Sequence, residues 1–424
     1  MQQLIIPLSA FEASDAGRFG PKAANLAALG RAGLPVPDGF CLDAQAYRIQ
    51  VAALGLAAAA RDINSPEPGR ARRAALDMKL GLLDRPIVPE ISEPLLAART
   101  ALAESSAAPL VVRSSALVED RFGSSFAWQF ESYLGLEDEV EFLTAVRSCW
   151  AALWSTRVLR YMATHDASPA DTAMAVLIQP LVAARVSGGG LSRTADGDMV
   201  LNATWGLGSA IAQGEVVPDR IVLSADGTLR ETAPGRKYHR VSCTHGGTRS
   251  VPRSLFAAPC LDAAQAVELG ALLRRAEKLM GMPVEIEWAL DEAGFKLLQA
   301  RALHVQAARE PSKIWMHHPL LSGHPAGIGW GEGRACVVSC ECELSRVGPG
   351  DILVTRVAGP ALSQILSRVA GVVAELGGST SHLASLARER GIPMVLGVLD
   401  ATQRIPDGVR VSVDGVAGVV RWMR

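Results

Sequence analysis

The chain has 424 residues, of which 49% are hydrophobic, and 42 lysine and arginine residues balance 43 aspartate and glutamate residues. This length exceeds what one hydrophobic core usually serves, so we expect two or three domains. The net charge of −1 indicates no surface for nucleic acid or an anionic membrane, and neither is expected as a partner.

Nothing in the sequence indicates export or membrane insertion. The amino-terminal MQQLIIPLSAFEASD lacks a basic segment, so no signal peptide is expected. The longest apolar run, VAALGLAAAA, is about half a membrane span. The seven cysteines are dispersed and odd in number, which favours a reducing compartment, the cytoplasm. Cys336, Cys340 and Cys342 lack CxxC spacing, so we expect packing residues rather than a zinc site.

Residues 1–305 alternate helical and strand patterns, which predicts an α/β or α+β domain. GPKAANLAALGRAGLPVPDGF predicts a short helix ended by Gly33, and PLVVRSSA predicts a buried strand. DAAQAVELGALLRRAEKLMG predicts an amphipathic helix with Asp262 as its cap and Gly281 as its end. Its expected apolar stripe is Leu269, Leu272, Leu273, Ala276, Leu279 and Met280.

The segment PVEIEWALDEAGFKLLQAR predicts a β-hairpin with its turn at DEAG. Strand alternation places Glu285 and Glu287 on one face, which without a ligand is a solvated face. Gln299 and Arg301 share that face only if odd positions pair with odd positions. The connecting loop must then have an odd length, or a bulge must intervene.

Residues 306–330 predict a linker, and residues 331–424 predict a small independent α/β domain. Strands are expected near 352–357, 370–376, 393–398 and 410–413, and helices near 360–368 and 379–390.

His382 is expected in the first turn of the last of these helices. Ser379, Thr380 and Ser381 offer hydroxyl groups for the cap, and the helix stops at Gly391. Free N–H groups and the positive end of the helix dipole gather there and favour a phosphate. His382 is therefore either a nucleophile whose phosphorylated form the helix stabilises, or a capping or surface histidine.

The stretch GGSTSHLASLARERGIPMVLG is similar to the swivelling phosphohistidine domain of phosphoenolpyruvate synthase, pyruvate phosphate dikinase and rifampin phosphotransferase. The upstream GDILVTRVAGP also resembles the first strand of that domain. The resemblance implies that His382 carries a phosphoryl group.

The amino-terminal part resembles the ATP-grasp-type nucleotide domain of the same family, and the sequence has no GxxxxGK[ST] loop. The similar segments follow the family order: GPKAANLAALGRAGLPVPDGF, VVRSSALVED, FAWQFESYLGL, WGLGSAIAQGEVVPD, EIEWAL and LQAR. The resemblance implies ATP phosphate contacts from Lys22 and Arg113, with Ser132 near the phosphates in place of a family threonine. Gln179, in LIQPLV, would lie at the adenine hinge.

The resemblance also implies a magnesium ion bound by Glu287 and Gln299, with Arg301 beside them. Phosphoryl transfer depends on positioning and charge neutralisation, which cations and an oxygen-bound metal ion supply. Two departures concern the loops near the phosphates. Pro21 stiffens the loop before Lys22, and Trp128 replaces a family glycine that lets backbone approach the phosphates.

The resemblance implies a dikinase-type phosphotransferase that splits ATP into AMP and phosphate. Phosphoenolpyruvate synthase and its dikinase relatives carry a pyruvate-binding barrel after the swivelling domain, and this chain stops just past that domain. Rifampin phosphotransferase carries an antibiotic-binding domain between its nucleotide and histidine domains, where this chain has only the expected linker. We therefore favour transfer to a small-molecule acceptor held by a separate subunit, by analogy with phenylphosphate synthase. The alternatives are a complete small-molecule kinase with its acceptor in the interdomain cleft, and a non-catalytic nucleotide-sensing protein.

Overall fold

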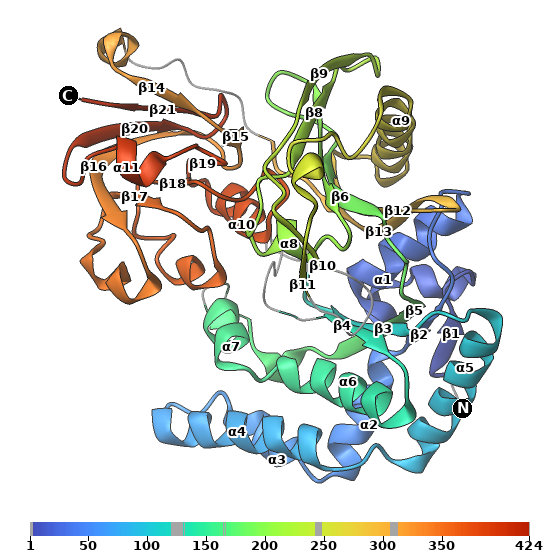
Figure 1. The fold of residues 1–424 in the computed structure, drawn as a ribbon. Coiled ribbons are helices and arrows are strands. Elements are labelled where there is room, and N and C mark those ends of the chain that lie inside the picture. Colours follow the sequence, from blue (N-terminus) through green and yellow to red (C-terminus); the bar gives the residue numbers. More distant parts are fainter. Residues whose placement is uncertain are drawn as a thin grey trace. The chain divides into compact units, whose positions relative to one another are not determined.

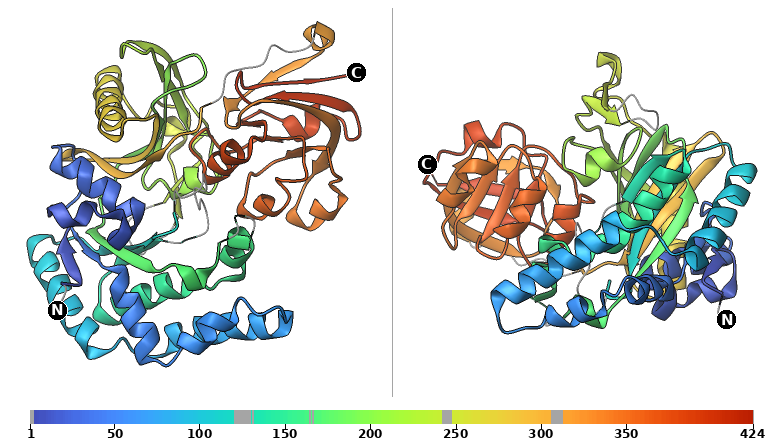
Figure 2. Two further views of the ribbon diagram at one scale, coloured as in Figure 1. Left: turned by 180° about the vertical axis from the view of Figure 1, so that it is seen from behind. Right: turned by 90° about the horizontal axis from the view of Figure 1, so that it is seen from below.

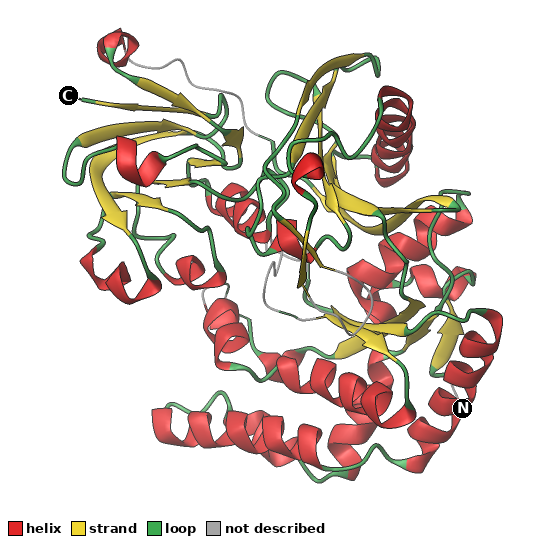
Figure 3. Ribbon diagram, viewed as in Figure 1, coloured by secondary structure: helices red, strands yellow, loops and turns green. Residues whose placement is uncertain are grey.

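The computed structural model describes residues 3–119, 130, 132–163, 165, 167–241, 248–305 and 313–423. The chain forms two compact units with mixed helices and sheets, as predicted (Figures 1 and 3). The first unit consists of Met1–Ala183, Cys243–His245 and Lys296–Arg301. The second consists of Ala184–Ser242, Gly246–Phe295 and Ala302–Arg424. This division differs from the expected boundaries, because the second unit joins part of 1–305 to the carboxy-terminal segment. Across the described residues, no helix combines the length and apolarity needed to cross a membrane.

The first unit contains an antiparallel sheet in the order β1-β2-β5-β3-β4. Its strands are β1 (Ile5–Pro7), β2 (Phe40–Leu42), β3 (Leu110–Ala116), β4 (Ser132–Leu136) and β5 (Met174–Pro180). Its helices are α1 (Ala16–Arg31), α2 (Ala44–Ala53), α3 (Ala57–Asp62), α4 (Pro68–Asp84), α5 (Pro89–Ser105), α6 (Glu139–Ala152) and α7 (Thr156–Ala163), with 3-10 turns η1 (Phe11–Ser14) and η2 (Pro169–Asp171). β5 is central, and its residues from Met174 to Ile178 are fully buried. The predicted strand PLVVRSSA is confirmed as β3.

The second unit begins with antiparallel strands in the order β12-β6-β7-β8-β9. They are β6 (Val186–Leu191), β7 (Met199–Trp205), β8 (Asp219–Leu223), β9 (Leu229–Ala233) and β12 (Val284–Asp291). The smaller elements are α8 (Ser209–Ala212), η3 (Arg253–Leu255) and a ribbon of β10 (His239–Val241) and β11 (Thr248–Ser250). β13 (Gly294–Ala302) follows β12 along the chain.

Helix α9 (Ala263–Met280) packs on one face of this sheet and ends as predicted (Figures 1 and 2). Asp262 and Gln265 form a reciprocal capping box, and Gly281 is left-handed with φ of 69°. The expected stripe is right at Leu269, Leu273 and Ala276, which are buried. It is wrong at Leu279, which is 51% exposed in the last turn.

The carboxy-terminal part of the second unit is an eight-stranded sheet in the order β14-β21-β20-β16-β17-β18-β19-β15. Its strands are β14 (Leu320–Ser322), β15 (His324–Pro325), β16 (Trp330–Val338), β17 (Ile352–Thr355), β18 (Gly371–Ala374), β19 (Met394–Leu396), β20 (Arg410–Asp414) and β21 (Val419–Trp422). The pairs from β16 to β19 are parallel, and the outer pairs are antiparallel. The four strands that the sequence predicts here are confirmed.

The turns and helices of this part are η4 (Lys313–His317), η5 (Glu341–Arg346), η6 (Pro360–Gln364), α10 (His382–Arg390) and α11 (Ala401–Arg404). The helix expected at 360–368 is only the 3-10 turn η6. The segment expected as a linker also differs, because β14 pairs with β21 and β15 pairs with β19. Leu321 joins the apolar core of the sheet, which accounts for this docking. Residues 306–312 lie outside the described part.

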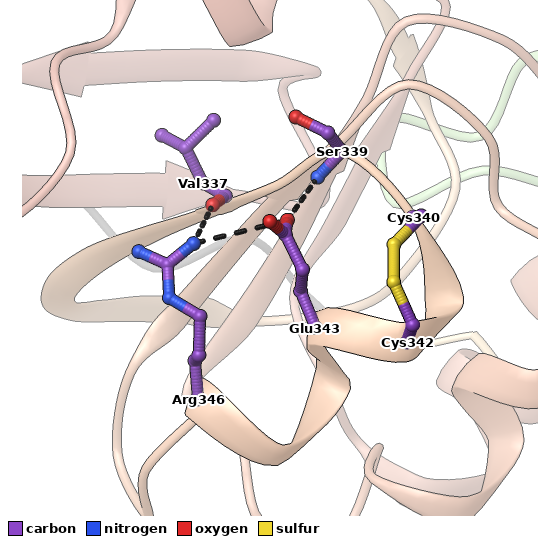
Figure 4. Close-up of a disulfide and its surroundings, with 6 residues drawn as sticks. All are labelled: Val337, Ser339, Cys340, Cys342, Glu343 and Arg346. Atoms are coloured by element: carbon purple, nitrogen blue, oxygen red, sulfur yellow. Dashed lines mark hydrogen bonds and ion pairs between the residues drawn. A yellow bond between two sulfur atoms is a disulfide. The ribbon is translucent and has the colours of Figure 1, made fainter.

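A disulfide joins Cys340 to Cys342 (Figure 4). The prediction that Cys340 and Cys342 are packing residues is therefore wrong, whereas Cys336 is buried as expected. Both disulfide-bonded residues are exposed, at the start of η5. In the same turn Glu343 accepts a hydrogen bond from the Ser339 amide at 2.8 Å and pairs with Arg346 at 3.8 Å (Figure 4). CxC spacing alone does not indicate such a turn.

His324 is a buried histidine whose protonated form is disfavoured in the folded state. It is 8% exposed, and its Nδ1 has no hydrogen-bond partner among the described residues. Burial, followed by the positive charges of Arg220 and Arg236, lowers its pKa from 6.5 to about 4. Below pH 6.5 the unfolded chain therefore binds a proton that the folded chain rejects until the pH approaches 4.

We therefore expect His324 to cost the fold up to about 3 kcal/mol as pH falls through this window, with full stability above it. Urea unfolding from pH 7.5 to 4 measures this effect. His324→Leu should show a shallower decline, whereas His304→Leu, at an exposed position, should follow the wild type. Parallel curves for wild type and His324→Leu would contradict the expectation.

Candidate active site

His382 is the first residue of α10, as the sequence predicts. The Ser381 hydroxyl caps the helix by accepting a hydrogen bond from the Ala384 amide at 3.3 Å, and left-handed Gly391 ends it. The apolar face of this helix, formed by Leu383, Leu386 and Ala387, is fully buried. His382 itself is half-buried, beside the amide groups of the first turn. This place suits an imidazole that gains negative charge on phosphorylation.

The loop before His382 lies against the sheet of the second unit. The amide and hydroxyl of Thr380 each donate to the Asn202 side-chain oxygen, both at 3.2 Å. A Cβ atom on Gly189 would come within 2.5 Å of Thr380, and one on Gly378 within 2.4 Å of Pro218. Glycine is therefore required on both sides of this contact, because any side chain would push the loop off the sheet.

Strand register aligns three residues beneath this loop. Glu287 of β12 is paired with Gly189 of β6, which is paired with Asn202 of β7. Directly paired residues of antiparallel strands share a face of the sheet. Glu287 therefore lies on the face that receives Thr380. Helix α9 covers the opposite face, where a Cβ on Gly190 would touch Leu273.

A cluster of charged side chains lies in the first unit. The Lys22 ammonium donates to the Ser114 carbonyl at 2.8 Å and lies 3.7 Å from a Glu119 oxygen. Burial raises the pKa of Glu119, and the charges of Lys22, Arg113 and Arg301 partly oppose the rise. Glu119 lies in the quoted segment VVRSSALVED, but sequence reasoning assigned it no role. The structure shows that it anchors the predicted phosphate ligand Lys22.

Two other predicted residues lie near Arg113. Its guanidinium donates to the Leu298 carbonyl, and to the Gln299 side-chain oxygen at 3.2 Å. Ser132 is paired with Arg113 across β3 and β4, so both lie on the same face of that sheet. The first unit contains the predicted residues Lys22, Arg113, Ser132, Gln299 and Arg301, and the second unit contains Glu287 and His382.

Two family models match the chain. Residues 16–318 match the pyruvate phosphate dikinase AMP/ATP-binding domain, and residues 347–418 match the mobile domain of PEP-utilising enzymes. Phosphoenolpyruvate synthase of Aeropyrum pernix is 31% identical over 95% of this chain and 56% of its own length. The same enzyme of Pyrococcus furiosus is 29% identical over 96% of this chain and 57% of its own. The chain belongs to the phosphoenolpyruvate synthase and pyruvate phosphate dikinase family.

The family membership confirms the resemblance and the ATP-grasp-like fold expected for the amino-terminal domain. A probable phosphoenolpyruvate synthase of Archaeoglobus fulgidus is 31% identical over 98% of this chain and 58% of its own length. The chain therefore spans just over half the length of these relatives.

Within this family fold, the Gln179 side chain already has a structural partner. Gln179 is 3% exposed, and its side-chain amide donates to the Pro37 carbonyl at 2.8 Å. The close approach leaves no room for a side chain on Gly39, whose Cβ would lie 2.2 Å from the Ile178 carbonyl. Gln179 thus ties β5 to the segment before β2, and its adenine contact stays a prediction.

The hairpin differs from the form that the metal prediction favours. β12 ends at Asp291 and β13 begins at Gly294, so two residues connect them, which is an even number. The alternation of buried residues along β13 nevertheless breaks, because Leu297 and Ala300 are both buried. The shared face of Gln299 and Glu287 stays a prediction.

The donor chemistry fits magnesium, which takes oxygen ligands from carboxylates and amides together with phosphates and water. Glu287 is half-buried, and the Gln299 oxygen accepts a hydrogen bond from Arg113 that a metal ion would have to share. Among the described residues, no three His, Cys, Asp or Glu side chains form a metal cage. Magnesium binding by Glu287 and Gln299 stays a prediction, in which phosphate oxygens and water would supply the remaining ligands.

The two departures from the family pattern have different outcomes. Gly20 has a φ of 73°, and a Cβ there would lie 2.5 Å from the Ser115 carbonyl, so the glycine is required. Pro21 follows this kink and opens the helical stretch that carries Lys22, where its fixed φ is compatible with a helix. Trp128 lies outside the described residues.

Proposed function

We propose that this chain is an ATP-dependent phosphotransferase of the dikinase type, with His382 as the phosphoryl carrier. The observation that carries the proposal is the seating of the Gly377–Thr380 loop on the Glu287 face of the sheet. Thr380 contacts Asn202 and Gly189, the two residues in register with Glu287. A carboxylate suited to magnesium and a histidine suited to phosphorylation are thus supplied by one unit.

The remaining predicted residues supply charge neutralisation. Lys22 provides a compact positive charge, and Arg113 and Arg301 provide planar guanidinium groups for phosphate oxygens. The Glu119 carboxylate pairs with the Lys22 ammonium and holds it in place. Magnesium, when bound by Glu287 and Gln299, neutralises charge on the phosphates. These groups position and stabilise, as phosphoryl transfer requires.

In the reaction that we propose, a ring nitrogen of His382 attacks the β-phosphorus of ATP, and AMP leaves. Water then removes the γ-phosphoryl group as inorganic phosphate, so one phosphoryl group stays on the ring. The helix N-terminus and its amides favour the added negative charge. The group then passes to an acceptor, which we place on a separate subunit.

The test is incubation with MgATP, followed by intact mass measurement and analysis of the nucleotide products. We expect one phosphoryl group per chain, labile to acid and stable to base, with AMP and phosphate formed in equal amounts. ADP as the sole product, or no adduct in the presence of bound nucleotide, would overturn the proposal.

Lys22→Met is expected to weaken MgATP binding about tenfold or more, because a charge-assisted phosphate contact is lost. Thermal protection by MgATP measures the change. Lys79→Met, at an exposed position on α4, is the matched control. Lys22→Met leaves the buried Glu119 carboxylate without its lysine partner. The double variant Lys22→Met/Glu119→Gln removes that carboxylate too, so weaker protection in the double variant reports the loss of the lysine charge itself. Equal protection of Lys22→Met and Lys79→Met would show that Lys22 does not hold phosphate.

A further inference from the structure

A buried polar network joins helix α10 to strand β12. Glu285 and Arg388 are 5% and 6% exposed, and Arg388 donates to a Glu285 oxygen at 2.9 Å. The Ser385 hydroxyl donates to the same carboxylate at 2.8 Å and accepts from Arg388 at 3.0 Å. The carboxylate, guanidinium and hydroxyl thus satisfy one another away from water.

Arg388 also reaches the loop that precedes His382. A second nitrogen of its guanidinium donates to the Ser379 carbonyl at 2.6 Å and to the Ala326 carbonyl at 3.2 Å. Ser379 lies three residues before His382. One planar group therefore fixes the end of α10, the loop at its start and strand β12 at once, which a lysine could not do.

We propose that Glu285 is a positioning residue: through Arg388 it latches α10 and its preceding loop onto the sheet, so that His382 is presented for phosphorylation. This inference rests on the proposed function of His382. Glu285 lies two positions from Glu287 on the same face of β12, so the latch and the expected magnesium ligand share one strand. In this account Glu287 contacts metal or phosphate and Glu285 does not.

The chemistry of the latch suits a contact that forms and releases. Burying an ion pair costs desolvation, which the mutual attraction roughly offsets, so the net free energy is small compared with that of an apolar interface. When the contact separates, both charges regain water. The adjoining contacts are polar or glycine-mediated, namely Thr380 with Asn202 and with Gly189. A phosphoryl carrier needs such a reversible interface because it must reach a donor and an acceptor in turn.

The first test measures docking without activity. Cysteines replace Asn202 and Thr380, whose side-chain oxygens lie 3.2 Å apart, and the rate of disulfide formation under mild oxidant is followed. Adding Glu285→Gln should slow cross-linking about tenfold or more, the loss expected for a charged hydrogen bond. Glu268→Gln, at an exposed position on α9, should leave the rate unchanged. Equal rates for Glu285→Gln and Glu268→Gln would overturn the latch.

The second test uses single-turnover phosphorylation in the protein without the added cysteines. Glu285→Gln should slow formation of the phosphoprotein about tenfold, and thermal protection by MgATP should be unchanged. A variant that merely destabilised the fold would lose both. In the cross-linking assay, which uses the protein that carries Asn202→Cys and Thr380→Cys, Glu285→Met/Arg388→Met should cross-link faster than Arg388→Met alone, because no unpaired charge is buried. If the double variant is no faster, the two residues do not act as a pair.

The two proposals fail in different ways. If the protein with Asn202→Cys and Thr380→Cys cross-links but the wild type never gains a phosphoryl group, the proposed function is contradicted, and the cross-linking rates alone decide whether Glu285 latches the loop. Glu285→Gln that is phosphorylated at the wild-type rate contradicts the latch and leaves the carrier role of His382 intact.

Discussion

His382→Ala is expected to abolish the acid-labile phosphoryl adduct that MgATP forms on the wild type. Alanine has no nucleophilic atom, and the expected phosphate ligands Lys22 and Arg113 belong to the first unit, whereas the substitution is in the second. Affinity for MgATP should therefore be nearly unchanged. Intact mass measurement reports the adduct, and thermal protection by MgATP reports binding.

His317→Ala is the matched control because it removes an exposed histidine. It should be phosphorylated to the same level as the wild type. An adduct of unchanged stoichiometry on His382→Ala would place the phosphoryl group on another residue. Loss of both the adduct and thermal protection would indicate damage beyond the missing imidazole.

Lys237→Met is expected to lower the free energy of unfolding by about 3–5 kcal/mol, the cost of leaving a buried charge without its partner. Lys237 and Asp219 form an ion pair in which both side chains are fully buried. Asp219 also accepts hydrogen bonds from the amides of Gly235 and Cys260, both at 2.7 Å. These amides hold the carboxylate in place but do not replace the positive charge.

Urea unfolding measures the loss, and Lys278→Met, at an exposed position of α9, should change stability by less than about 0.5 kcal/mol. If Lys237→Met behaves like Lys278→Met, the buried pair does not contribute as described. Asp219→Asn/Lys237→Met should recover part of the loss, since no charge is then buried.

The sequence predicted those elements whose signals are local. α9 has a cap, an apolar period and a left-handed glycine at its end, and α10 has the same signals around His382. β14 and β15 were missed because they have three and two residues, too few to show alternation. Leu279 fits the helical period but lies in the last turn of α9, where the sheet no longer covers it.

The motifs identified candidate residues, but only strand register shows which of them lie together. Pairing of Glu287 with Gly189 and Asn202 places the expected magnesium ligand under the Thr380 loop. No sequence spacing connects these positions. Glu285 was read as part of a solvated strand face, because its partner Arg388 lies about a hundred residues away. Long-range pairs of this kind leave no local pattern.

The most direct test of phosphoryl carriage by this chain is a single-turnover reaction with two ATP samples, one labelled at the β-phosphate and one at the γ-phosphate. We predict that the β-label becomes attached to His382, with one group per chain and an equal amount of AMP, while the γ-label is released as inorganic phosphate. Retention of the γ-label on the protein with ADP as product, or no retained label from either sample, would contradict the account.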